Sequence, residues 1–132
     1  MQNRFEFLKD RFPKLAEYGE KAEEALEDSD HNICLLNLGR IAENITEFLC
    51  RKNHIDKSIP SENALDELVR LEAIDDKIKR KINALTEIGN EAAENDYDSK
   101  NACTLLIKTA QELCGWFMLK HGEGNFEFLA DL

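Results

Sequence analysis

Proline and glycine are scarce in this sequence, which has 2 Pro and 6 Gly among 132 residues. Collagen-like chains and Pro/Gly-rich disordered chains need far more of both, so these classes are excluded. No apolar run approaches the ~20 residues that a membrane-spanning helix requires. The N-terminal segment carries charges where a secretory signal would be apolar. We therefore expect a globular protein that stays in the cytoplasm and does not contact a membrane.

Basic residues are outnumbered, with 17 Lys and Arg against 27 Asp and Glu and a formal net charge of -10 at pH 7. Non-specific affinity for nucleic acid comes from Lys and Arg that displace counterions from phosphates. Nucleic-acid binding is therefore not expected. The 4 cysteines form no CxxC pair and lie in apolar stretches. They are expected to be buried, reduced thiols.

The apolar residues recur at helical spacing along nearly the whole chain, and no segment alternates as a half-buried strand does. This pattern predicts an all-α fold, an antiparallel bundle of four to five helices with short connections. Residues 1–125 are expected to form this single domain, and residues 126–132 a C-terminal tail or connector.

The expected helix boundaries follow from prolines, capping residues and breaks in the apolar pattern. A short opening helix is expected near residues 5–10. Longer helices are expected to start at Pro13, Ser29 or Asp30, Ser61, Asp76 and Ser99. The helix from Asp76 is expected to fray near residues 95–98, and Gly122 is expected to end the last helix in the left-handed conformation.

Standard catalytic signatures are missing, including the phosphate-binding GxxxxGK[ST], the nucleophile elbow GxSxG and the zinc motif HExxH. The three histidines are far apart in sequence and are interpreted as surface or capping residues. Cys50 and His54, one helical turn apart, are the one candidate nucleophile pair, but nothing in the sequence orients the imidazole. No cofactor and no metal site is expected.

An acidic series follows Pro13, and only Lys21 interrupts it. Residues three or four apart on a helix share a face. The acidic ridge predicted in this way consists of Glu17, Glu20, Glu24 and Glu27. Such a ridge is either a solvated face or a surface that attracts a basic partner or imitates the spacing of phosphates. Both interpretations stay open at this point.

The most informative segment is residues 85–94, where Gly89 interrupts an otherwise regular helical pattern. Glycine inside a helix costs roughly 1 kcal/mol relative to alanine, so it indicates a close approach of two backbones. Together with Ala92 and Ala93 it would form a thin helix face. Asn90 is expected to bond to a neighbouring loop or helix end.

Several segments together resemble a known family. They are Phe5–Leu8, Arg11–Leu15, Gly19–Glu23, Leu38–Glu43, Ile88–Ala92 and Cys114–Phe117. The family is the helical domain of unknown function at the N-terminus of type I restriction enzyme R (HsdR) subunits, which also occurs in other bacterial defence proteins and as a standalone chain. The resemblance covers nearly all 132 residues. The family is similar in turn to the HEPN (higher eukaryotes and prokaryotes nucleotide-binding) bundles, many of which are metal-independent RNases.

The chain departs from the family motif at both ends. The motif has an Arg three residues before its Gly-Asn pair and a His four residues after the Asn. In this sequence these positions hold Thr86 and Glu94. The groups that would stabilise a phosphate and shuttle a proton are thus replaced by a hydroxyl and an anion. The resemblance therefore implies that Gly89 and Asn90 preserve packing while the catalytic chemistry is lost.

The resemblance implies a non-catalytic protein-interaction module whose partners are restriction-modification subunits, and a homodimer formed through its helices. Two alternatives stay open. One is a divergent HEPN-like, metal-independent RNase, for which Arg51 and His54 provide an Arg-x-x-His of shorter spacing than the HEPN pattern. The other is an acidic inhibitor, either a DNA mimic or an antitoxin-like protein, that acts through the acidic ridge.

Overall fold

The computed structural model describes residues 3–56 and 58–122, and in this part of the chain every regular element is a helix. A 3₁₀ turn, η1 (Glu6–Leu8), precedes five α-helices. These are α1 (Pro13–Glu27), α2 (His31–Lys52), α3 (Ser61–Arg70), α4 (Asp76–Asn95) and α5 (Lys100–His121). The expected all-α class is confirmed. The tail proposed for residues 126–132 lies outside the described residues.

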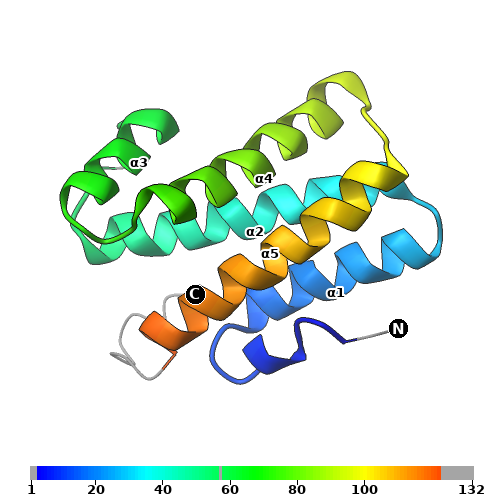
Figure 1. Ribbon diagram of the computed structural model, residues 1–132, viewed down its shortest axis with the longest axis horizontal. Helices are drawn as coiled ribbons and strands as arrows, with labels where there is room; N and C mark the ends of the chain where they lie inside the picture. The colour runs from blue at the N-terminus through cyan, green and yellow to red at the C-terminus, as the bar shows by residue number, and fades with distance from the viewer. Residues whose placement is uncertain (1–2, 57, 123–132) are drawn as a thin grey trace.

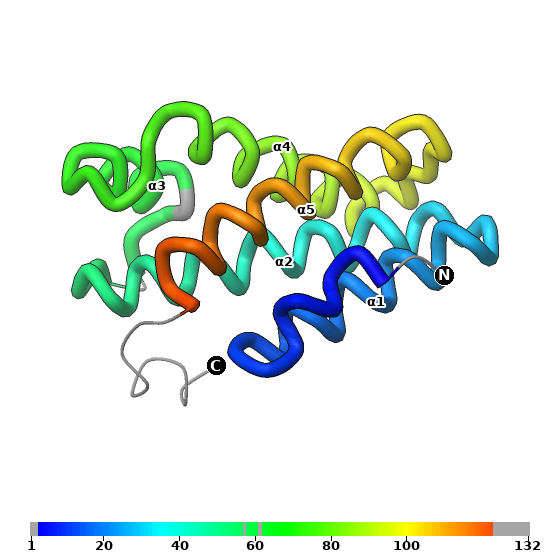
Figure 2. Tube along the Cα trace, turned by 60° about the horizontal axis from the view of Figure 1, so that its bottom comes forward, coloured from blue at the N-terminus to red at the C-terminus, as the bar shows by residue number. Residues whose placement is uncertain are grey.

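The four long helices alternate in direction along the bundle, which confirms the antiparallel arrangement (Figure 1). Helix α2 lies at the centre and packs against α1, α4 and α5. The short α3 sits at one end of the bundle, beside the C-terminal end of α2 and the beginning of α4 (Figure 2). Because α3 is short, it covers only this end and leaves most of α2 and α4 to the other helices.

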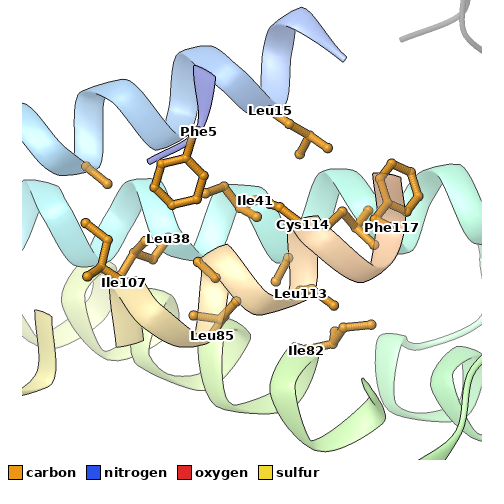
Figure 3. Packing of buried hydrophobic residues seen from close by; sticks show 14 of the residues in the cluster. Phe5, Leu15, Leu38, Ile41, Ile82, Leu85, Ile107, Leu113, Cys114 and Phe117 are labelled. Atoms are coloured by element: carbon orange, nitrogen blue, oxygen red, sulfur yellow. The ribbon is translucent and has the colours of Figure 1, made fainter. Parts of the chain in front are cut away.

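The core is one continuous cluster of apolar side chains from η1 and all five helices. Figure 3 shows residues of α1, α2, α4 and α5 converging, with Leu38 and Ile41 of α2 at the centre. Three phenylalanines close one end of the bundle. The rings of Phe12 and Phe117 lie 4.6 Å apart and those of Phe48 and Phe117 4.9 Å apart, in tilted and edge-to-face arrangements that aromatic rings favour.

Polar side chains cap three of the helices at their beginnings. Asp30 accepts a hydrogen bond from the amide of Ile33 (3.4 Å), which selects Asp30 over Ser29 as the cap of α2. Asp75 caps α4 (2.8 Å to the amide of Ile78), and Ser99 caps α5 in the same way. Capping side chains therefore fix the starts of these three helices near the positions that the sequence predicts.

Helices α2 and α4 cross where two glycines face each other. A Cβ atom added to Gly89 would lie 2.8 Å from the Cα of Gly39, and one added to Gly39 would lie 2.9 Å from the Cα of Gly89. Carbon atoms of two side chains do not approach so closely, so both positions require glycine for lack of space. The close backbone approach predicted for Gly89 is confirmed, and its partner is Gly39.

The end of α5 differs from the sequence expectation, whereas the end of α4 agrees with it. Gly122 is right-handed (φ -68°, ψ -26°), because its amide still donates to the carbonyl of Met118 and so continues the helical pattern. Left-handed residues instead follow the four earlier α-helices: Ser29 after α1, His54 after α2, Glu72 after α3 and Asp96 (φ 52°) after α4. Helix α4 ends at Asn95, within the segment 95–98 where the sequence predicts its end, and the Asn32 side chain donates to the carbonyls of Ala92 (2.9 Å) and Tyr97 (3.0 Å) there.

Candidate functional site

A cleft of about 640 Å³ opens between α2, α3 and α4, at the end of the bundle where α3 lies. The segment that joins α2 to α3 forms part of its wall. Among the described residues, it is lined from α2 by Glu43, Thr46, Glu47, Cys50 and Arg51; from the connecting segment by His54, Ile55, Asp56 and Ile59; from α3 by Ala64 and Leu65; and from α4 by Ile82, Asn83, Thr86 and Asn90. Its size is within the range of small-molecule and peptide sites.

One face of α4 brings two of the motif positions to this cleft. Asn83, Thr86 and Asn90 follow each other at steps of three and four, so they form one stripe of the helix. Glu94 continues the stripe by one turn, but it is exposed and does not line the cleft. The degenerate motif is therefore split between the cleft and the solvent.

The packing positions of the motif lie on a different face of α4. Gly89 and Ala92 are buried against α2, as expected for a thin face. Ala93 is exposed, so its predicted role in helix packing was wrong. The side chain of Asn90 is exposed and makes no hydrogen bond in the described part of the chain. The helix-end bond expected from Asn90 is made instead by Asn32 of α2.

Carboxylates dominate the charges at the cleft. Glu43, Glu47 and Asp56 are exposed acids on its walls. The amide of Ser58 donates to Asp56 (2.9 Å), and this hydrogen bond lowers the pKa of the Asp56 carboxyl. The guanidinium of Arg51 lies 3.1 Å from a carboxylate oxygen of Glu47, one turn before it on α2. The described lining of the cleft therefore carries a net negative charge, and the guanidinium of Arg51 is paired with the carboxylate of Glu47.

The structure also brings the residues of both catalytic hypotheses to this cleft. Arg51, His54 and Cys50 all line it. Burial raises the pKa of the Cys50 thiol, which is the opposite of what a thiolate nucleophile needs. No hydrogen bond joins Cys50 to His54 among the residues described. The arrangement therefore does not activate this thiol.

The acidic ridge of α1 is a separate surface. All four of its residues, Glu17, Glu20, Glu24 and Glu27, are exposed. Lys21 forms an ion pair with Glu17 (3.0 Å) and offsets part of the ridge charge. Glu23, within the same acidic series, turns inward and is 4% exposed, where it accepts a hydrogen bond from the amide of Arg4 (2.8 Å). The helical spacing thus correctly grouped the four exposed acids and left out Glu23, whose carboxylate is buried.

One buried polar contact gave no signal in the sequence. His121, near the end of α5, is 8% exposed, and the ammonium group of Lys52 lies 3.0 Å from its Nδ1 atom. Burial in the first place, and then Lys52 and Lys120, lower the pKa of His121 from 6.5 to about 4. Its imidazole is therefore neutral at pH 7 and accepts a hydrogen bond from Lys52. A histidine at a helix end was interpreted as a surface or capping residue, whereas this one is part of the core.

The cysteines confirm the expectation of free thiols. No two of them are joined as a disulfide, and Cys34, Cys103 and Cys114 are buried while Cys50 is half-buried. Within residues 3–56 and 58–122, no three His, Cys, Asp or Glu side chains gather closely enough to hold a metal ion. The helices of this same region are all too short or too polar to cross a membrane. Comparisons of the chain with protein-family models, curated proteins and solved structures gave no match.

Proposed function

We propose that this protein is a non-catalytic protein-interaction module that binds its partner in the cleft between α2, α3 and α4. The charge of the cleft carries this proposal. Glu43, Glu47 and Asp56 would repel the phosphates of a nucleic acid, and Arg51 is already paired with Glu47. The motif positions on its wall are the uncharged Thr86 and Asn90. These groups can bind and orient a partner, but they do not stabilise charge on a reacting phosphate.

The partners we propose are restriction-modification subunits of a bacterial defence complex, on the resemblance of the chain to the N-terminal helical domain of type I restriction R subunits. The same resemblance supports a HEPN-like bundle that forms homodimers. We also propose a cytoplasmic location, which the free cysteines support. The net charge of -10 argues against nucleic acid as a partner.

A divergent metal-independent RNase is the second candidate, because Arg51 and His54 lie in one cleft with Asn90. Two observations weigh against it: Arg51 is engaged by Glu47, and Glu94 faces solvent outside the cleft. The acidic inhibitor is a third candidate, since the ridge residues Glu20 and Glu24 are exposed.

One experiment separates the interaction module from the acidic inhibitor. The purified chain is mixed with the purified subunits of a type I restriction-modification complex, and the mass of any complex is measured by light scattering. We expect a complex that Asn90→Arg in the cleft disrupts and that the ridge variant Glu20→Lys/Glu24→Lys leaves intact. Disruption by the ridge variant alone would favour the acidic inhibitor. Absence of any complex would overturn the proposal.

The RNase candidate is tested in parallel by incubating the protein with RNA in the presence of EDTA. The proposal predicts no cleavage above the level of an Arg51→Ala/His54→Ala variant. Cleavage by the wild-type chain that this variant lacks would assign catalysis to the cleft.

A further inference from the structure

The cleft has an apolar interior as well as an acidic rim. Ala64 and Leu65 of α3 and Ile82 of α4 are 4%, 3% and 1% exposed, and they form its floor. Ile55 and Ile59 extend this apolar surface onto the segment between α2 and α3, where Ile59 is 37% exposed. A ligand that fits must therefore present apolar groups to the floor.

The acids stand on the rim, above this floor. Glu43 has no ion-pair partner in the described part of the chain, and the Asp56 carboxylate is hydrogen-bonded there by Ser58, not by a cation. The guanidinium of Arg51 pairs with the carboxylate of Glu47. The described lining therefore has three carboxylates against one guanidinium, so the charge complement of this rim is a cation.

The shape of the cleft favours a chain segment over a small cation. Its walls on α2 (residues 43–51) and α4 (residues 82–90) each run for about 12 Å, at a helical rise of ~1.5 Å per residue. This length matches about two turns of a helix. A small cation would fill little of the 640 Å³ and would leave the apolar floor in water.

We infer that the occupant of the cleft is a basic amphipathic segment of a partner protein, whose aliphatic side chains contact Leu65 and Ile82 while its Lys or Arg side chains pair with Glu43 and Asp56. This inference rests on the proposed function and names the chemistry of the partner. Binding of this kind is the helix-in-groove mode, in which apolar anchors give affinity and rim charges give orientation.

The probe for the experiment is a fluorescently labelled 14-residue peptide with Leu at helical positions i, i+3 and i+7 and Arg at the positions that flank this apolar face. Its Kd is measured by fluorescence anisotropy for the wild-type chain and for two variants that remove the same number of charges. Glu43→Gln/Asp56→Asn changes the cleft, and Glu20→Gln/Glu24→Gln changes the ridge. Far-UV circular dichroism and thermal unfolding establish that both variants are folded.

We expect the cleft variant to raise the Kd at least tenfold and the ridge variant to raise it less than twofold. A peptide with Glu in place of Arg should not bind. Equal weakening by both variants would mean that the peptide responds only to net charge, and it would overturn the inference. Tighter binding of spermidine than of the peptide at the cleft would overturn it in favour of a small cation.

Cys50 gives an independent measurement, because it is half-buried on the cleft wall while the other three thiols are buried. Bound peptide should slow alkylation of Cys50 by iodoacetamide at least fivefold. An unchanged rate would place the peptide elsewhere. If Asn90→Arg disrupts the complex with restriction-modification subunits but the peptide does not protect Cys50, the proposed function stands and the basic occupant is wrong.

Discussion

Gly39 and Gly89 fix the distance between α2 and α4, and this distance sets the width of the cleft beside them. Asn90, the next residue in the sequence after Gly89, lines the cleft. Adjacent residues of α4 thus serve helix packing and the cleft wall. A glycine in the middle of a helix is costly by its intrinsic propensity. Its presence twice at one crossing shows that contact between the helix backbones outweighs this cost.

We predict that Gly89→Ala lowers the free energy of unfolding by about 2 kcal/mol, since the added methyl group would meet the Cα atom of Gly39 and would force the helices apart. Gly115→Ala is the matched control, because no atom lies within 4 Å of the Cβ position at Gly115 in α5. It should raise the free energy of unfolding by ~0.5–1 kcal/mol through helix propensity. Urea denaturation followed by circular dichroism measures both, and a gain in Gly89→Ala would show that the crossing can open without cost.

The sequence pattern predicted what kind of contact a residue such as Gly89 makes, but it did not predict which residue is on the other side of that contact. The helical spacing predicted that Gly89 needs a close neighbour, yet Gly39 lies 50 positions away, and nothing local pairs the two. The same limit explains the error at Asn90. The sequence predicts that Asn90 bonds to a neighbouring loop or helix end, but only the fold shows that Asn32 is the residue that bonds to a helix end, that of α4.

At the scale of the element, helix α4 depends on its first turn. Asp75 precedes it in extended conformation, and its side chain accepts a hydrogen bond from the amide of Ile78 (2.8 Å). The same turn begins the wall that carries Ile82, Asn83 and Thr86 into the cleft. Removing the Asp75 cap should therefore destabilise the end of α4 that faces α3.

We predict that Asp75→Ala destabilises the protein by about 1 kcal/mol, because an amide of the first turn loses its acceptor. Asp75→Asn keeps an oxygen in the same place and should lose less than half as much. The midpoints of thermal unfolding compare the two variants with the wild type. Equal losses in both would mean that the charge of Asp75, and not its hydrogen bond, stabilises α4.

The helices themselves were well predicted from sequence, since apolar spacing, Pro13 and the caps are local signals. The position of α3 was not predicted. Its apolar face identifies it as a helix that packs on something, but several surfaces of the bundle would satisfy that requirement. The cleft depends on where α3 packs, so a site that unites Arg51, His54 and Asn90 could not be foreseen from their separation in sequence.

At the scale of the whole molecule, stability depends on a histidine that joins the C-terminal ends of α2 and α5. His121 of α5 contacts the rings of Phe48 and Phe117 at 5.2 and 5.1 Å, and Lys52 at the end of α2 donates to it. Protonation would place a cation in this aromatic cluster beside two lysines, Lys52 and Lys120. The folded state therefore resists protonation more strongly than the unfolded chain does.

We predict that this difference makes global stability fall as the solution is acidified from pH 6.5 towards pH 4. The pKa of His121 is about 4 in the folded state and near 6.5 when unfolded, so in this window the unfolded chain binds the proton first. The contribution of His121 is fully present above pH 6.5. Urea unfolding at steps of half a pH unit should show a shallower decline for His121→Gln than for the wild type. A wild-type slope in His121→Gln would assign the acid sensitivity to the carboxylates of the molecule instead.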